Sequence, residues 1–437
     1  MENTEKKTSK AETLWDVAVI GGGPAGMMAA GRAAELLPGK VILIEKNASL
    51  GKKLLITGGG RCNVTNAEFD TRKLLDKFKN KGKFLFSAFS QWNVKETLDF
   101  FHARKMETKV ENGQRVFPVS NKAQSVWDVL VNYMKSGKVE VLSDSPVVGF
   151  IEENKMITGV KLKNKKIIRA KSIILATGGT SRPETGSTGD GYAWLKKIGH
   201  TVTLPAPSLV PVAVKDNWVK RLAGVSLSDI KITTLQNGEK QGVIKKGKVL
   251  FTHVGLSGPT ILNMSKDIGE LLKYGEVTIS LDLLPALDYG QLNAKLQEIF
   301  KENCNKKFKN SLSGPGLAGG LIPSALVPII VELSGIDGDT QCNSITRDQR
   351  VMLVKFLKDI SIQVDKLLGV EKAIITSGGV SLDEIDFKTM RSRLFPNLYL
   401  VGDLLDIDRP SGGYSLQLCW TTGFVAGTAA AASSSQA

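Results

Sequence analysis

A strand, a glycine-rich turn and a helix follow one another near the start of the chain, and this order most constrains its fold. The β-branched run DVAVI at residues 16–20 is typical of a buried parallel strand. It leads into Gly21-x-Gly23-x-x-Gly26 and then into a stretch of helical composition. In this motif the first glycine permits a tight turn, the second lets the backbone approach a diphosphate, and the third lets the helix pack on the strand. The pattern predicts a dinucleotide-binding unit.

A second strand, KVILIEK, places Glu45 nineteen residues after Gly26. An acid at about this distance binds both hydroxyls of an adenosine ribose and repels a 2′-phosphate. The N–H groups and the dipole at the N-terminus of the first helix would face the phosphates. This part of the chain therefore predicts the following cofactor-binding residues: Gly21, Gly23, Pro24, Ala25, Gly26, Glu45 and Lys46.

The C-terminal part of the chain indicates which dinucleotide binds. Gly402 and Asp403 follow the strand-like run LYLVG, and Gly413 precedes a helix expected to start near Tyr414. The arrangement resembles flavoproteins with two dinucleotide-binding folds, and the resemblance implies FAD, with Asp403 near the ribityl chain and phosphate. The dipole of the last helix would then stabilise negative charge on the flavin pyrimidine. On that helix, Tyr414 and Gln417 either contact the ring or only pack against the protein.

The stretch SIILATGG has the composition of another buried strand, and we expect Thr177 and Gly178 at its end to contact the cofactor. It is followed by ETGSTGDGYAW. There we expect Gly189 and Gly191 to form a turn and Asp190 to cap the next helix.

Nearly the whole chain resembles bacterial NAD(P)/FAD-dependent oxidoreductases, the family that includes aminoacetone oxidase and a flavoprotein of bile-acid dehydroxylation. The motifs that carry this resemblance are GKKLLITGGGRCNVTN, GQRVFPVSNKAQSVWDVLV, LFTHVGLSGPTIL and ITSGGVSLDEID. It implies an α/β fold in which a Rossmann-like FAD domain of the two-dinucleotide-binding type is interrupted by an insert with a β-barrel part and a helical part. The expected boundaries are 14–205 and 373–437 for the FAD domain and 206–372 for the insert, with its helical part at about 285–345.

Local patterns agree with this layout. IKITTL and EVTISLDL alternate like strands, and a helical stretch begins around Tyr289. A helix is also expected in IPSALVPIIVELSG, where Pro328 would remove a hydrogen bond and cause a kink. The low-complexity tail at residues 429–437 is expected to fray.

The loop TGGGRCN would lie against the cofactor in this family. The resemblance implies that the Gly59 and Gly60 backbone approaches the flavin and diphosphate, that Arg61 offers positive charge, and that Asn63 offers a hydrogen bond. Cys62 is either a catalytic thiol activated by its neighbour or a small buried residue under the ring. Val148 is the remaining expected cofactor contact.

The catalytic residue is not fixed by any motif. His253, beside a glycine-rich turn, is either an acid or base or a histidine satisfied by the backbone. Cys62 and Tyr414 are the other candidates, whereas His102 and His200 are expected to be structural. The four cysteines form no C-x-x-C pair, so neither a metal site nor a disulfide framework is expected.

The net charge of +15 raises the question of an anionic partner. The lysines are scattered, which favours a role in solubility and argues against a nucleic-acid partner. The polar N-terminus, MENTEKKTSK, lacks the apolar stretch of a signal peptide and is expected to be disordered. We expect a cytoplasmic protein without a membrane span.

These observations favour an FAD-dependent oxidoreductase that transfers a hydride between flavin N5 and a small organic substrate. Oxygen or NAD(P)H would be the redox partner, and NAD(P)H would bind only transiently, because no second strand-turn-helix unit of this kind is expected between residues 150 and 370. The alternative is a flavin-dependent tRNA-modifying protein, for which the positive charge would be functional.

Overall fold

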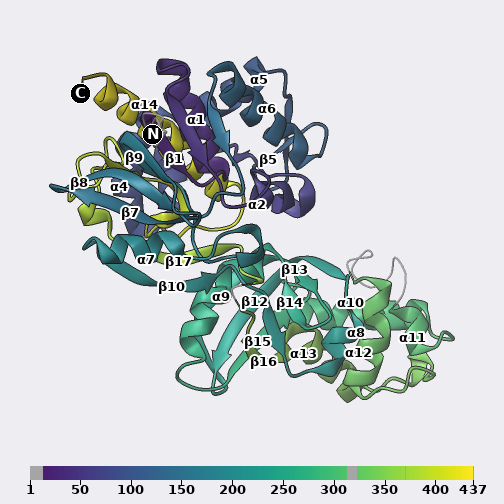
Figure 1. The fold of residues 1–437 in the computed structure, drawn as a ribbon. Coiled ribbons are helices and arrows are strands. Elements are labelled where there is room, and N and C mark those ends of the chain that lie inside the picture. The colour runs from purple at the N-terminus through teal and green to yellow at the C-terminus, as the bar shows by residue number, and fades with distance from the viewer. Residues whose placement is uncertain (1–12, 313–321, 370, 437) are drawn as a thin grey trace, which may run out of the picture. The chain divides into compact units, whose positions relative to one another are not determined.

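The computed structural model describes residues 13–312, 322–369 and 371–436. The chain forms two compact units, which are described separately below (Figure 1). Unit 1 contains Met1–Pro207 and Ile374–Ala437, and unit 2 contains Ser208–Ala373. Unit 1 is therefore assembled from both ends of the chain. The predicted disorder of residues 1–10 lies outside the described residues.

Unit 1 is built on a seven-stranded sheet with the order β6-β2-β1-β9-β8-β7, in which β18 also pairs with β9. Its strands are β1 (Leu14–Ile20), β2 (Val41–Ile44), β6 (Glu140–Leu142), β7 (Val147–Glu153), β8 (Met156–Leu162), β9 (Ile167–Leu175) and β18 (Leu398–Leu400). Strand β9 is shared: residues 167–169 pair antiparallel with β8, and residues 173–175 pair parallel with β18. The C-terminal segment thus completes a sheet that the N-terminal segment begins.

The other elements of unit 1 surround this sheet (Figure 1). Its helices are α1 (Pro24–Leu36), α2 (Lys52–Ile56), α3 (Thr71–Asp76), α4 (Gly82–Gln91), α5 (Val94–Ala103), α6 (Ala123–Ser136), α7 (Asp190–Lys197) and α14 (Tyr414–Gln436). Two small sheets are formed by β3 (Thr65–Asn66), β5 (Arg115–Pro118) and β4 (Thr108–Glu111), and by β10 (Val202–Ser208) with β17 (Ile375–Val380).

Helices α1 and α14 pack closely because α14 carries glycine where it meets α1. A Cβ on Gly423 would lie 2.5 Å from the carbonyl oxygen of Ala25, and one on Gly427 would lie 2.5 Å from that of Ala29. Real Cβ atoms do not approach backbone oxygens so closely. Only glycine therefore permits this backbone approach.

Unit 2 contains a closed barrel with the strand order β11-β14-β13-β12-β15-β16. The strands are β11 (Val212–Val214), β12 (Ser226–Gln236), β13 (Glu239–Phe251), β14 (Gly255–Ser257), β15 (Val277–Asp282) and β16 (Ile360–Leu367). The helices are α8 (Asn217–Arg221), α9 (Pro259–Leu271), α10 (Tyr289–Glu302), α11 (Phe308–Ser311), α12 (Val327–Ser334) and α13 (Arg347–Lys358). In β15, Val277, Ile279 and Leu281 are fully buried and alternate with partly exposed residues, as expected for a barrel wall.

The predicted α/β fold, a Rossmann-like domain interrupted by a barrel and helices, is confirmed. The predicted kink at Pro328 is wrong. Helix α12 begins at Val327, which places Pro328 in the first turn, where its missing N–H has no helical partner to lose. Within the part of the chain that the structure describes, none of the helices has the length and apolar character that crossing a membrane requires.

The predicted fraying of the tail is also wrong, because α14 continues to Gln436. Its end is held by Ser434, whose hydroxyl donates to the Asp16 carbonyl at 2.9 Å and lies 3.0 Å from the Ser172 hydroxyl. Low complexity did not predict mobility here, because alanine and serine are small enough to pack against the sheet.

A buried chain of hydrogen bonds joins the two segments of unit 1. The His200 Nδ1 atom lies 2.7 Å from a Glu384 carboxylate oxygen, and its Nε2 atom lies 2.9 Å from the Ser392 hydroxyl. The Ser392 oxygen already accepts from two backbone N–H groups, so its own proton is directed to Nε2. His200 is therefore a neutral imidazole that donates from Nδ1, as expected for a structural histidine.

Both ionisable members of this chain have a pKa below its ordinary value. Burial lowers the pKa of His200 from 6.5, although Glu384 opposes this effect. Burial raises the pKa of Glu384, but hydrogen bonds from Thr201 and His200 outweigh it and hold the pKa below 4.5. Because the unfolded chain protonates first at each site, acidification favours unfolding.

We therefore expect the melting temperature to fall as the pH is lowered from 7 to 5, the range in which unfolded histidine gains its proton. The substitution His200→Gln should lower the melting temperature at pH 7 and reduce its slope between these two pH values. His102→Gln is the control, because His102 is exposed and bonds only to Thr108 among the described residues. Identical slopes in wild type and His200→Gln would contradict this role.

Candidate functional site

The turn between β1 and α1 uses its three glycines differently. Gly21 has a φ of +105°, and a Cβ there would lie 2.5 Å from the Ala176 carbonyl oxygen. A Cβ on Gly26 would lie 1.9 Å from the Gly21 carbonyl oxygen. A Cβ on Gly23, in contrast, would meet nothing within 4 Å. Packing inside the protein requires Gly21 and Gly26, whereas Gly23 leaves open space at the N-terminus of α1.

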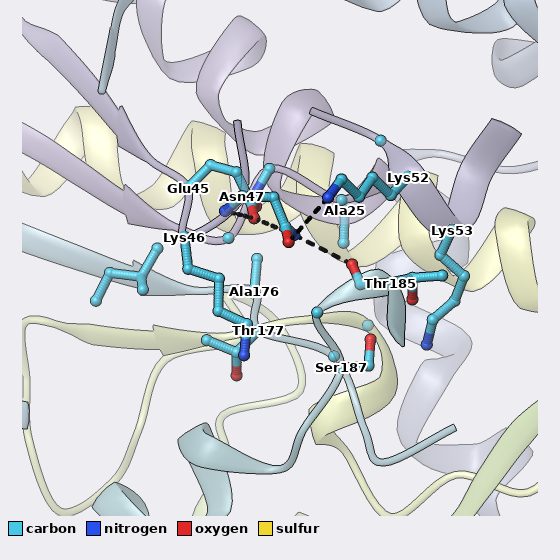
Figure 2. Close-up of a pocket in the computed structure, with 18 of the residues that line it drawn as sticks. Ala25, Glu45, Lys46, Asn47, Lys52, Lys53, Ala176, Thr177, Thr185 and Ser187 are labelled. Atoms are coloured by element: carbon cyan, nitrogen blue, oxygen red, sulfur yellow. Dashed lines mark hydrogen bonds between the residues drawn. The ribbon is translucent and has the colours of Figure 1, made fainter. Parts of the chain in front are cut away.

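A pocket lies beside this turn and holds about 920 Å³ of space between protein atoms, including solvent at its mouth (Figure 2). The lining includes predicted residues from both segments of unit 1: Gly21, Gly23, Pro24, Ala25, Glu45, Lys46, Thr177, Gly178, Gly402 and Asp403. The fold thus brings the N-terminal and C-terminal motifs to one cavity.

The Glu45 carboxylate is buried at one end of this pocket. One of its oxygens accepts from the Gly22 N–H at 2.7 Å. The other accepts from the backbone and side-chain N–H groups of Asn47, at 2.8 and 2.7 Å. A carboxylate has about four acceptor positions. Three are used by the protein, so Glu45 both fixes the turn and retains capacity for one ribose hydroxyl.

A segment at residues 185–190 borders the pocket and is tied to the end of β2 (Figure 2). The Lys46 ammonium lies 2.8 Å from an Asp190 carboxylate oxygen and 2.5 Å from the Thr188 hydroxyl. Asn47 also donates to the Thr185 carbonyl at 3.2 Å. The predicted cap by Asp190 is wrong: α7 begins at Asp190 without a side-chain cap, and the carboxylate binds Lys46 instead.

Charged residues also meet at the stretch after β18. The Asp403 carboxylate forms an ion pair with Arg409, whose guanidinium also donates to the Ile407 carbonyl. Burial raises the pKa of Asp403, but Arg409 and Lys53 lower it further, so the net pKa is below its ordinary value. Asp403 is therefore an anion held at the pocket wall.

The TGGGRCN loop does not enter the pocket lining. Gly59 and Gly60 have φ values of +68° and +83°, and a Cβ on either would meet nothing within 4 Å. The Arg61 guanidinium pairs with Glu111 and lies 4.1 Å over the Phe117 ring. Space is therefore open beside the backbone of Gly59 and Gly60, but the Arg61 guanidinium binds to the β4–β5 hairpin.

Several other predicted contacts also lie outside the lining: Gly26, Cys62, Asn63, Val148, Gly413, Tyr414 and Gln417. Val147, one residue earlier than predicted, lines the pocket in place of Val148. Gln417 is fully buried, and its amide bonds to Thr65, Thr97 and Thr421. Gly413 packs on Thr65, because a Cβ there would lie 2.3 Å from that backbone.

The three catalytic candidates occupy different environments. Burial raises the pKa of the Cys62 thiol to about 12, so the thiol is protonated and a poor nucleophile at neutral pH. Burial also raises the pKa of Tyr414, whose ring meets Phe78 edge to face at 6.1 Å. His253 is exposed in the turn between β13 and β14 of unit 2. The structure favours the packing interpretation of Cys62.

The sequence did not single out other lining residues, among them Asn47, Lys52, Lys53, Ser145, Val147, Thr185, Gly186, Ser187, Trp194 and Cys419. Most belong to no local motif, because they reach the pocket through tertiary packing. Lys52 and Lys53 stand inside GKKLLITGGGRCN, so their proximity to the glycine loop was the signal that could have found them.

The lining fits a dinucleotide. The Thr177 hydroxyl is buried, and no hydrogen-bond partner for it occurs among the described residues, so a ligand could satisfy it. The N-terminus of α1, with open space at Gly23, suits a diphosphate, and Glu45 suits a ribose. Within the described part of the chain, no group of three or more histidine, cysteine or acidic residues is arranged to hold a metal ion.

Comparison with known proteins gives consistent matches along the chain. The family model for the HI0933-like protein Rossmann domain matches residues 15–429. The 3-dehydro-bile acid delta(4,6)-reductase of Clostridium scindens is 31% identical over 434 residues, which cover 95% of this chain and 98% of the relative. The ribosomal RNA dihydrouridine synthase of Escherichia coli is 29% identical over 412 residues, which cover 93% of this chain and 96% of the relative.

Among solved structures, the open conformation of a flavocytochrome c3 fumarate reductase matches with a TM-score of 0.55 and 18% identity. The match covers 97% of this chain and 79% of that structure. At this identity the similarity concerns the fold alone.

Gly23→Val should abolish FAD binding without unfolding the protein. Gly23 has a φ of −78°, which valine tolerates, and its side chain would extend only into the open space before α1. We expect the variant to keep the melting temperature of the apo-protein and to lose FAD affinity by more than about a hundredfold, or ~2.7 kcal/mol. Gly26→Val is the contrasting variant, which should not fold. Normal FAD binding by Gly23→Val, measured by fluorescence titration, would place the cofactor elsewhere.

Cys62→Ser should keep bound FAD and reduce the rate of flavin reduction less than threefold, because the protonated buried thiol contributes packing and not nucleophilicity. Stopped-flow absorbance measures this rate directly. A loss of more than about a hundredfold with normal FAD content, ~2.7 kcal/mol of transition-state stabilisation, would restore Cys62 as a catalytic residue.

Proposed function

This chain belongs to the family of HI0933-like proteins, and we propose that it reduces a carbon–carbon double bond conjugated to a carbonyl group in a small organic substrate. It is an FAD-dependent oxidoreductase. The observation that supports the proposal is the pocket beside the glycine turn of unit 1, in a chain whose relatives are named for two reductions.

These two named reactions share one chemistry. A delta(4,6)-reductase of a 3-dehydro-bile acid acts on double bonds conjugated to a 3-oxo group. Dihydrouridine differs from uridine by hydrogen added across C5 and C6, a double bond conjugated to the C4 carbonyl. Both reductions are consistent with hydride addition to an electrophilic carbon of the conjugated system, which is the β carbon of an enone or the δ carbon of a dienone, and with proton addition to the neighbouring carbon on the carbonyl side.

FAD, when bound, supplies the hydride from N5 in its reduced form. The protein's part is to hold the cofactor, and we propose that the N-terminus of α1 binds the diphosphate, Glu45 one ribose hydroxyl, and Asp403 the ribityl side. NAD(P)H is the proposed electron donor, because the net reaction consumes two electrons that an outside reductant must replace. Its binding would be transient.

A uracil base in RNA is the second candidate substrate, and one feature of unit 2 favours it. Lys231 on β12 stands directly opposite Lys246 on β13, and both side chains are exposed. Like charges in such cross-strand positions destabilise an antiparallel pair. Lys245 and Lys248 are exposed on the same strand as Lys246. An anionic partner such as RNA would relieve this repulsion.

The experiment supplies the purified FAD-loaded protein with NADH or NADPH under anaerobic conditions. One arm offers steroid and acyclic enones, and the other offers ribosomal and transfer RNA, with products identified by mass spectrometry. We expect enone reduction that is unchanged in Lys231→Glu/Lys246→Glu. Dihydrouridine formation that survives 200 mM salt and fails in this double variant would replace the small-molecule substrate with RNA, since charge contacts set nucleic-acid affinity. Absence of both products would refute the proposed reaction.

A further inference from the structure

Lys53 differs from the other charged residues of the pocket. Lys46 has a carboxylate partner, since its ammonium lies 2.8 Å from Asp190. The Lys53 ammonium donates to the Ser181 hydroxyl at 3.2 Å. Within the described residues, no carboxylate oxygen lies within 4.0 Å of it. Lys53 thus brings a positive charge to the lining that no neighbouring acid neutralises directly.

The acid with the largest effect on the pKa of Lys53 is already engaged. Asp403 raises the pKa of Lys53, but burial lowers it more, so the net pKa is below its ordinary value. Asp403 forms its ion pair with Arg409, which is 5% exposed. One buried carboxylate therefore faces two cations. A buried charge without a matching partner is costly, and an anionic ligand group would remove that cost.

The position of Lys53 restricts which ligand group this can be. Figure 2 shows Lys53 on the side of the pocket away from Glu45 and Lys46, the end at which we place the adenosine ribose. The anionic groups beyond the ribose are the diphosphate and, after reduction, the isoalloxazine ring. Both would attract the same partly buried ammonium.

We propose that Lys53 is the counter-charge for an anionic group of the bound dinucleotide, either the diphosphate or the reduced isoalloxazine. The proposal rests on FAD binding in this pocket and goes further, because it assigns a charge-balancing role to a residue outside the glycine motif. Lys53 is then a positioning residue whose loss changes binding or reduction potential.

The test uses Lys53→Met, which keeps most of the length of the side chain and removes its charge. Affinities of the apo-protein for ADP and for FAD are measured by calorimetry, and the flavin midpoint potential is measured on the holoprotein. If the diphosphate is the partner, the affinities for ADP and FAD both fall at least tenfold. If the reduced ring is the partner, ADP affinity is unchanged and the midpoint potential falls by at least about 30 mV, the equivalent of tenfold weaker relative binding of the reduced form for a two-electron couple.

Two variants separate charge from structure. Lys53→Arg should restore most of the lost affinity or potential, and Ser181→Ala, which removes the hydrogen bond but keeps the charge, should resemble wild type. The apo form of Lys53→Met should melt no lower than the wild-type apo-protein, since a partly buried charge without a directly paired acid is removed. The proposal is wrong if Lys53→Met alters neither affinity nor potential, or if Ser181→Ala reproduces its effect. Failure of the wild-type protein to bind FAD would instead refute the assignment of the pocket.

Discussion

The backbone approach between α1 and α14 is the constraint on which unit 1 depends. The two helices come from opposite ends of the chain, and Gly423 and Gly427 let them touch without intervening side chains. This contact fixes where the strand before α14 can join the sheet, and so where Gly402 and Asp403 meet the N-terminus of α1. The pocket is a product of this contact as much as of the glycine motif.

Sequence reasoning succeeded where the signal was local. The turn from β1 into α1 needs glycine for reasons that act within a few residues, and Gly21 and Gly26 meet those needs through contacts of 2.5 and 1.9 Å. Strands of the barrel could also be predicted from the sequence, because alternate residues such as Val277 and Ile279 are apolar and buried. Glu45 could be predicted as well, because it lies at the end of the second strand, nineteen residues after Gly26.

Sequence reasoning failed where distant partners decide the outcome. Arg61 was expected at the cofactor, but Glu111 and Phe117 on a hairpin fifty residues away compete for its guanidinium. Aspartate is a common helix-capping residue, but the Asp190 carboxylate forms an ion pair with Lys46 instead. The motif around Lys53 could have drawn attention to this residue but not to its environment, which is created by Asp403, Arg409 and Ser181, all far along the chain. The partners of such charged side chains are determined by residues that are distant in the sequence, and a local motif does not reveal them.

The sharing of strand β9 has a consequence for how the protein is made. Its first residues pair with β8, which is synthesised just before it, but its last residues pair with β18, more than two hundred residues later. Because chains emerge from the ribosome N-terminus first, the glycine motif is exposed long before β18 and α14 exist. Until then, the hydrophobic edge of β9 and one wall of the pocket are missing. If FAD binds in this pocket, as proposed above, its capture has to wait until β18 and the residues Gly402 and Asp403 have been synthesised, which is after unit 2.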